Sequence, residues 1–374
     1  MHIALDAYYY QAVGLALAIV FAFSRNRRID VFPLVAVGTW LIAVCAIYFK
    51  YGNEQAFFYS NDQYVHLDNI RVYIENDGFN FQSIISLRYL ITYPTYLLSK
   101  IGFDEILVLK TIQIVSLIGI YFTSKKVLLS KDLSLKLWHF AFIASPLMIF
   151  FSFFALRDLT LALFVISYIF ERRIQHRAFI IALVFLLKPH LAISLLFGTF
   201  ALAVFRVVRT NLNYYVAFLF LSFSYFLGAV SYSIGTYFKD GFYPGFPREL
   251  FSQAKISQLA LNFSGLQFFS FVNDPTFPSV TTPTYLLLLA RIVLFDTFLI
   301  PLSFIFTSVF LLRYLKNESF LLISSFVFFL GLVSQTDFNS TRQNIPFLAV
   351  MGIVSVVNIE AALSFRRKGL LSQS

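Results

Sequence analysis

Residues 31–49 read VFPLVAVGTWLIAVCAIYF, a run without a charged side chain. A helix rises about 1.5 Å per residue and the hydrocarbon core of a bilayer is about 30 Å thick, so a run of this length crosses a membrane. The rest of the chain has the same character. Of its 374 residues, 59% are hydrophobic and only 13% are charged, which is too little charge to cover a soluble protein of this size. The sequence therefore predicts an all-α, polytopic membrane helix bundle.

About eleven apolar stretches follow one another along the chain. We expect them to form a single integral membrane domain over residues 1–374. The stretches lie at 7–24, 30–49, 104–124, 137–155, 159–171, 178–190, 191–206, 212–232, 293–312, 319–335 and 344–362. The single cysteine, Cys45, lies inside the second stretch, so neither an intramolecular disulfide nor a thiolate metal cluster is expected.

The basic residues give the chain a net charge of +10, and they gather in alternate connections between the predicted spans. The clusters are Arg25, Arg27 and Arg28; Lys125, Lys126, Lys131 and Lys136; Arg172, Arg173 and Arg177; Arg206 and Arg209; Arg313 and Lys316; and Arg366, Arg367 and Lys368. Short cytoplasmic loops of membrane proteins are enriched in Lys and Arg. The pattern therefore predicts an N-terminus outside, a C-terminus in the cytoplasm and no nucleic-acid partner.

This topology leaves two long segments on the outer side, at 50–103 and 233–292. Within the first, apolar residues recur at helical spacing over Phe81–Leu98, with polar residues between them. Such a piece is too polar to cross a bilayer and is typical of an interfacial or re-entrant helix. We expect the two segments to cap the bundle, and any chemistry to lie on this outer side.

Four cations stand at the outer ends of predicted spans: Arg157, Lys188, Arg291 and Arg342. Ionisable groups at membrane depth are costly and mark functional sites. We expect the four to gather around an outward-facing cavity, where guanidinium forks and an ammonium bind phosphate oxygens. The alternative for each of them is an anchor that extends its charge to the lipid head groups.

The acidic and histidine residues near these ends also allow two interpretations. Asp158 and Asp337 are either neutralising partners of the neighbouring arginines or part of the site. His190 is either a structural hydrogen-bonding residue or a general base. The remaining candidates lie in the first outer segment, where solvated polar residues are also common; they are Asp62, His66 and Asp68.

Standard catalytic and binding motifs are absent. The chain has no P-loop, no GxGxxG after a strand, no HExxH and no nucleophile-elbow serine. Its five histidines and one cysteine are too scattered for a zinc site. We therefore expect neither ATP-driven transport nor metalloprotease activity, and neither a metal nor a cofactor.

Three stretches, within residues 55–200 and 335–362, resemble the EpsG/Wzy-type polymerases of bacterial surface polysaccharides. They are Asn61-Asp62-Gln63-Tyr64 with the following Phe81–Leu98; Leu156-Arg157-Asp158 with Glu171–Arg177 and Lys188-Pro189-His190; and Arg342-Gln343-Asn344 before the last span. The paired Arg-x10-Gly motifs of some O-antigen polymerases are not found.

The resemblance implies a GT-C-like bundle in the bacterial inner membrane that joins oligosaccharide repeat units at its outer face. Donor and acceptor are glycans on undecaprenyl pyrophosphate, and a chain-length regulator is an expected protein partner. Arg157 and Arg342, with Lys188 and Arg291, would bind the pyrophosphate. His190 would be the general base, with Asp62 or His66 as its substitutes.

Two other classes of protein fit the same features. One is a GT-C-type glycosyltransferase that uses a single lipid-linked sugar, with Asp62 as base or metal ligand. The other is a non-enzymatic transporter of lipid-linked sugars, whose polar groups would lie near the membrane midplane.

Overall fold

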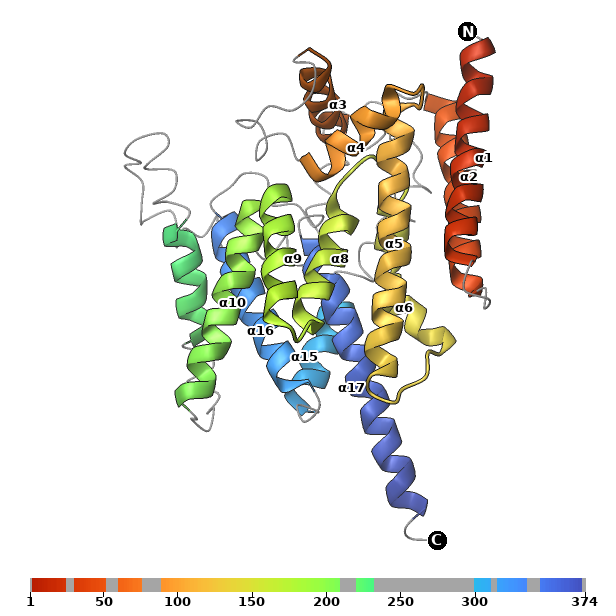
Figure 1. Ribbon diagram of the computed structural model, residues 1–374. Coiled ribbons are helices and arrows are strands. Elements are labelled where there is room, and N and C mark those ends of the chain that lie inside the picture. The colour runs from red at the N-terminus through yellow and green to blue at the C-terminus, as the bar shows by residue number, and fades with distance from the viewer. Residues whose placement is uncertain are drawn as a thin grey trace, which may run out of the picture.

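The computed structural model describes residues 2–24, 30–51, 60–75, 89–208, 220–231, 299–310, 315–334 and 344–371 (Figure 1). All elements in these ranges are helices. The first are α1 (His2–Ser24), α2 (Val31–Tyr51), α3 (Ser60–Glu75), α4 (Tyr89–Ser99) and α5 (Glu105–Leu129). Then come η2 (Leu137–His139), α6 (Phe140–Ile143), α7 (Pro146–Phe151), α8 (Asp158–Phe170), α9 (Ile174–Leu187) and α10 (Pro189–Val208). The last are Phe220–Ser231, α15 (Ile300–Phe310), α16 (Lys316–Ser334) and α17 (Ile345–Leu371).

Five of these helices are long and apolar enough to cross a membrane, so the described part of the chain has the all-α structure of a helical membrane protein. The five stretches are Ala7–Ser24, Val31–Phe49, Glu105–Leu129, Pro189–Arg206 and Ile345–Ser364. Shorter apolar helices lie over Asp158–Phe170, Ile174–Leu187, Phe220–Ser231 and Asn317–Leu332. A count of eleven spans remains a prediction.

The expected span over 137–155 is wrong as a single helix. The chain there forms three short helices, η2, α6 and α7. Proline has no backbone N–H and kinks or breaks a helix when it lies in the interior, but it fits the first turn of a new one. Pro146 accordingly begins α7, and the Ser145 hydroxyl caps it by accepting from the Met148 backbone N–H.

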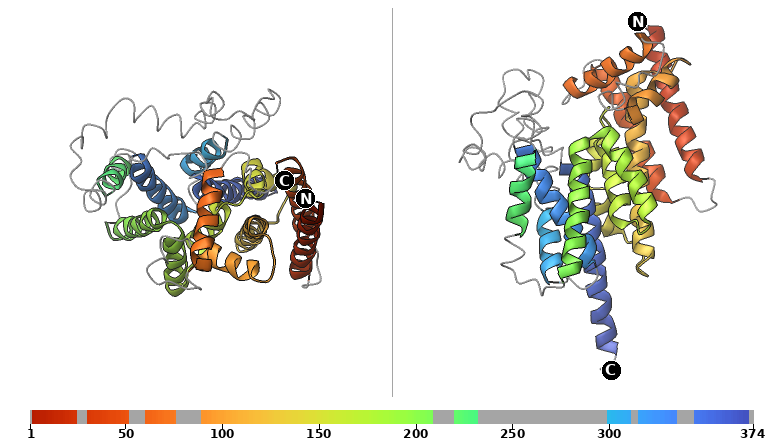
Figure 2. Two further views of the ribbon diagram at one scale, coloured as in Figure 1. Left: turned by 90° about the horizontal axis from the view of Figure 1, so that it is seen from above. Right: turned by 60° about the vertical axis from the view of Figure 1, so that its left-hand side comes forward.

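The first outer segment contains two helices, α3 and α4, which lie across one end of the bundle (Figures 1 and 2). We call this end the cap end. The helix expected over Phe81–Leu98 is represented by α4, while residues 81–88 lie outside the described residues, as does the whole segment 233–292.

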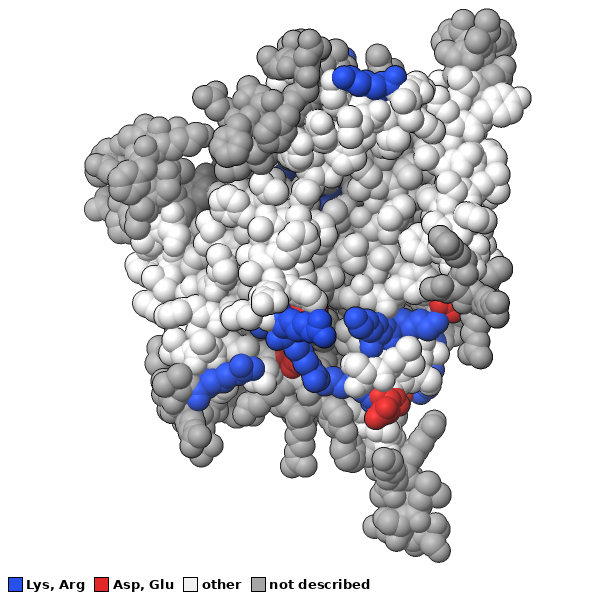
Figure 3. Space-filling model, viewed as in Figure 1, with Lys and Arg blue, Asp and Glu red and all other residues white. Residues whose placement is uncertain are grey.

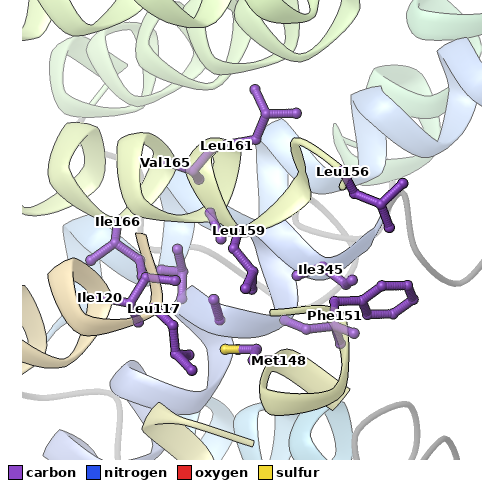
Figure 4. Packing of buried hydrophobic residues seen from close by; sticks show 14 of the residues in the cluster. Leu117, Ile120, Met148, Phe151, Leu156, Leu159, Leu161, Val165, Ile166 and Ile345 are labelled. Atoms are coloured by element: carbon purple, nitrogen blue, oxygen red, sulfur yellow. The ribbon is translucent and has the colours of Figure 1, made fainter. Parts of the chain in front are cut away.

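The centre of the bundle is formed by α5, α8 and α17. Of the spanning stretches, that of α17 is 78% buried and that of α5 is 67% buried, whereas those of α1 and α2 are each 22% buried. Figure 4 shows Leu117 of α5, Leu159 of α8 and Ile345 of α17 in one apolar cluster. Lipid tails are as apolar as these side chains, so close packing rather than transfer from water holds such helices together.

Helices α10 and α16 show how closely packed the backbones are. A Cβ added at Gly198 would lie 2.0 Å from the Ser325 hydroxyl and 2.8 Å from the Leu321 carbonyl oxygen. Only glycine fits here, as at other small-residue helix contacts in membranes.

The substitution Gly198→Ala is therefore expected to destabilise the protein by about 1–3 kcal/mol, since overpacking forces the two helices apart. Gly14→Ala is the matched control, because a Cβ at Gly14 meets nothing within 4 Å and alanine favours a helix. Thermal unfolding of both variants in detergent tests this. Equal melting temperatures would show that the contact between α10 and α16 is looser than described.

Basic side chains gather at the end of the bundle opposite α3 and α4 (Figure 3). The connections after α5 and between α8 and α9, which contain two of the clusters seen in the sequence, lie at this end. The gathering of Lys and Arg at one end of the bundle agrees with the sequence, in which basic clusters occupy alternate connections between the predicted spans.

Two ion-pair groups connect helices at the basic end. Lys125 Nζ lies 2.6 Å from Asp30 Oδ2, which links α5 to the start of α2. Lys136 Nζ lies 2.6 Å from Glu360 Oε2, and His139 Nε2 lies 3.0 Å from Glu360 Oε1. The His139 Nδ1 accepts from the Lys136 backbone N–H, so Nε2 carries the hydrogen and donates it to Glu360. These bonds fasten η2 to α17.

Glu171, in the connection between α8 and α9, accepts hydrogen bonds at the same end. The backbone N–H of Arg173, with smaller contributions from His176 and Arg172, lowers the pKa of Glu171 from 4.5 to about 2. Hydrogen bonds to the ionised form favour that form.

A carboxyl whose pKa is depressed by folding stabilises the protein above its unfolded pKa and loses this effect as the pH falls through the folded pKa. Glu171→Gln should therefore melt below wild type at pH 7, and the difference should shrink between about pH 4.5 and pH 2. Melting temperatures measured across this range test the assignment. A difference that does not change with pH would contradict it.

Candidate functional site

The first turn of α8 lies inside the bundle and is capped by a side chain from α5. Gln113 Oε1 accepts from the Leu159 backbone N–H at 3.2 Å, and Gln113 Nε2 donates to Thr160 Oγ1 at 3.3 Å. The Ser116 and Thr160 hydroxyls lie 2.9 Å apart. The first backbone N–H groups of a helix need acceptors, and no water is available in a packed interior. Here the acceptor is the Gln113 side chain of α5.

The same contacts give the depth of the α8 N-terminus. Gln113 meets Leu159, and further along Gly119 lies against Leu163, so α5 and α8 run in the same direction. Gln113 lies eight residues into α5, which begins at Glu105. At 1.5 Å per residue, α8 starts about 12 Å inside the cap end of α5. Helices α3 and α4 lie above this level (Figure 1).

Arg157 immediately precedes α8 and reaches across to α9. Its Nη1 donates to the carbonyl oxygen of Leu187, the last residue of α9. A cation is favourable at a helix C-terminus, where carbonyl groups have no partner within the helix. One bond therefore joins the start of α8 to the turn between α9 and α10, thirty residues later.

This turn is dictated by Pro189. The residue before a proline avoids the helical conformation. Lys188 accordingly has φ −155° and ψ 88°, which ends α9, and Pro189 begins α10. Lys188 and His190 are thereby presented next to Arg157.

Lys188 is 8% exposed, with its Nζ 5.1 Å from the ring centroid of Phe329 on α16. An ammonium over an aromatic face is attracted by the ring quadrupole. The Phe329 ring lies 5.2 Å from that of Phe347 on α17, and buried Asn344 precedes that helix. Within the described ranges, Asn344 Oδ1 has no hydrogen-bond partner. Residues from the ends of α8, α9, α10 and α17 and from α16 thus form one group: Arg157, Lys188, His190, Phe329 and Asn344. We call this group of side chains the recess; the name denotes these five residues and no measured cavity.

The structure thus brings together three of the residues predicted for the site: Arg157, Lys188 and His190. Lys188 is buried and His190 is exposed, so the imidazole lies at the rim. Asp158 is buried in the first turn of α8, where a carboxylate is favourable beside the helix N-terminus.

The other predicted site residues lie on the cap or outside the described residues. Asp62 and His66 are on α3, and His66 is buried. Asp68 is exposed and pairs with Arg71 at 3.5 Å, as expected of a solvated residue. Arg291 and Arg342, predicted to bind pyrophosphate, lie outside the described residues, as does Asp337.

Sequence reasoning missed Gln113 and Thr160, which hold α8 at its depth. The available signal was a polar side chain within an apolar span, since such groups need partners inside the protein. In the described part of the chain, no three His, Cys, Asp or Glu side chains form a group that would hold a metal ion.

Comparisons of the chain with protein-family models, curated proteins and solved structures find no match. The relation to EpsG/Wzy-type polymerases therefore remains a resemblance between short motifs.

The recess is chemically suited to an anion. It combines the Arg157 guanidinium with the buried Lys188 ammonium, which lies over the Phe329 ring. Ionic hydrogen bonds are stronger in such surroundings than in water. A phosphate or diphosphate at the head of a lipid matches both the charge and the depth.

Gln113→Leu removes the cap of α8 while nearly keeping the side-chain volume. We expect a loss of about 1–3 kcal/mol, because the Leu159 N–H is left without an acceptor in the interior. Gln175→Leu, at an exposed position on α9, is the control. Detergent melting curves test the prediction, and two unchanged curves would contradict the capping role.

Proposed function

We propose that this protein is a polymerase that joins lipid-linked oligosaccharide repeat units at the outer face of a bacterial inner membrane. The observation that supports the proposal most is the bond from Arg157 to the Leu187 carbonyl, which joins two cations in one recess beneath α3 and α4. Under this proposal the cap end faces outward and the basic end faces the cytoplasm.

The donor is a glycan on undecaprenyl pyrophosphate, and the acceptor is a repeat unit on a second carrier. The acceptor hydroxyl attacks the anomeric carbon of the donor, and the bond from that carbon to the diphosphate oxygen breaks. Negative charge grows on the leaving diphosphate, so fixed cations lower the barrier there. Arg157 and Lys188 supply this charge, with Arg342 and Arg291 as further members.

A base must take the proton of the acceptor hydroxyl. His190 is the first choice, because histidine is the side chain that most often serves as a general base and this one lies exposed beside both cations. Asp62 and His66 on α3 are the substitutes, since α3 covers the same end of the bundle.

Purified full-length protein mixed with lipid-linked repeat units should form higher oligomers, which gel electrophoresis of the released glycan detects. Arg157→Ala and Lys188→Met should reduce the rate by about 100-fold or more, the size of effect seen when a group that stabilises transition-state charge is lost. Arg173→Ala, at the opposite end of α9, is the matched control and should retain the wild-type rate.

In cells, Arg157→Ala should give surface glycan of single-repeat length while export of the repeat continues. A normal long-chain ladder from an inserted Arg157→Ala protein would refute the site assignment.

The same assay separates the rival functions. A glycosyltransferase that uses one lipid-linked sugar would transfer a monosaccharide and lose all transfer in Asp62→Ala. A transporter would form no glycosidic bond with any purified donor.

A further inference from the structure

An open groove of about 550 Å³ lies on the bundle between α6 and α15. Cavities that hold small molecules have volumes in this range. We call it the side groove. Its lining consists of Trp138 of η2, Ala141 and Phe142 of α6, and Leu299, Leu302, Ser303 and Phe306 at the start of α15 and within it. Apart from Ser303, these side chains are apolar or aromatic, so the groove suits a hydrocarbon chain.

The two walls of the side groove rest on the same helix. Both α6 and α15 pack against α17. A Cβ added at Gly352 of α17 would lie 2.4 Å from the Phe142 carbonyl oxygen, so α6 touches α17 through its backbone. On α15, Phe304 is buried, whereas Leu302 is 56% exposed and Phe306 is 62% exposed. The face of α15 that is turned away from the core therefore forms one wall of the groove.

Two contacts with α17 give the direction of the groove in a membrane. Phe142 meets Gly352, which lies near the middle of the spanning stretch Ile345–Ser364. Lys136 pairs with Glu360, eight residues further along the same helix. At 1.5 Å per residue, these two levels are about 12 Å apart along α17. The wall formed by η2 and α6 thus runs from the hydrocarbon interior to the basic end, where it meets a cation.

Lys136 is placed to bind a head group at that end. Its Nζ donates to both Glu360 oxygens, at 2.7 and 2.6 Å, and its side chain is 37% exposed. An ammonium has three donors, so one N–H is available for an acceptor outside the protein. Lys126 and Lys131 lie in or beside the same connection, and basic residues gather at this end (Figure 3). Basic pockets between spanning helices attract anionic head groups.

Trp138 lies between the cation and the apolar part of the groove. It follows Lys136 by two residues and lines the groove with Phe142. Tryptophan is enriched at the level of lipid head groups, because its ring is apolar and its N–H is polar. The order of Lys136, Trp138 and Phe142 therefore matches the order of charge, interface and chain in a phospholipid.

We propose that the side groove binds one acyl chain of an anionic phospholipid, with Lys136 Nζ donating to the phosphodiester. The groove supplies an apolar surface for the chain, and the basic end supplies the charge for the head group. This site lies at the end of the bundle opposite the recess. The inference goes beyond the proposed polymerase activity and does not depend on it.

The test uses full-length protein, freed of lipid in detergent and titrated with phosphatidylglycerol, with bound lipid counted by native mass spectrometry. The comparison probes are phosphatidylcholine with the same chains, glycerol 3-phosphate without chains, and undecaprenyl phosphate. The tightest-bound phosphatidylglycerol should bind about tenfold more strongly than phosphatidylcholine, which corresponds to about 1.4 kcal/mol. Glycerol 3-phosphate should not displace it, because the apolar groove contributes nothing to a ligand without a chain.

Matched variants separate the groove from the rest of the surface. Ala141→Phe places a ring in the groove and should weaken phosphatidylglycerol binding about tenfold, because the chain loses its atom contacts there. Ala18→Phe, at an exposed position on α1, should leave binding unchanged. Lys136→Met should weaken binding about tenfold, and Lys136→Arg should stay within about threefold of wild type. Arg172→Met removes an exposed cation between α8 and α9 and should have no effect.

Four results would overturn the inference. The first is equal binding of phosphatidylglycerol by Ala141→Phe and Ala18→Phe. The second is equal binding of phosphatidylglycerol and phosphatidylcholine by the wild type, and the third is displacement of the lipid by glycerol 3-phosphate. The fourth is binding of undecaprenyl phosphate that exceeds that of phosphatidylglycerol and is lost in Ala141→Phe, since the groove would then hold an isoprenoid chain. If Lys136→Met does not fold, Ala141→Phe and Lys136→Arg decide the question.

Discussion

The hydrogen bond from the Leu159 backbone N–H to Gln113 Oε1 is the constraint on which the recess depends. A helix that starts in the interior exposes backbone donors where water is excluded, and each unsatisfied donor costs free energy. Gln113, on the neighbouring helix α5, removes part of that cost by accepting from the Leu159 N–H. This allows α8 to start well below the cap end. The residue just before α8, Arg157, is thereby held at depth instead of at the surface.

The recess also depends on opposite helix ends meeting. The start of α8 faces the end of α9, and Arg157 donates through Nη1 to the carbonyl oxygen of Leu187 at the end of α9. Pro189 makes that end abrupt, so Lys188 turns inward over Phe329. The Arg157 bond, the end of α9 and the turn at Pro189 therefore all help to fix the positions of the two cations. None of these contacts requires a metal or a disulfide.

Much of the architecture follows from the sequence because long apolar runs have few alternatives in a bilayer. The stretches of α1, α2, α5, α10 and α17 and the break at Lys188-Pro189 were predictable on that ground. The gathering of Arg157 with Lys188 followed from their shared place at the ends of spans. The single span predicted over 137–155 was wrong, and Pro146 accounts for the break because an interior proline kinks or breaks a helix.

What the sequence did not reveal are pairings between distant residues. Nothing near Gln113 indicates that its partner is Leu159, and nothing near Glu360 indicates Lys136 and His139. Such partners are chosen by helix packing, which single-sequence patterns do not encode. The side groove belongs to the same class, because Trp138 and Phe306 line it from distant parts of the chain.

The α1–α2 hairpin is attached to the bundle at two levels. Gln11 joins it to the chain beside Asp104 near one end of α5, and Asp30 joins it to Lys125 near the other. A hairpin attached at one level could rotate about that attachment. Because it is attached at both levels, the α1–α2 hairpin is held along the length of α5 and resists rotation away from the bundle.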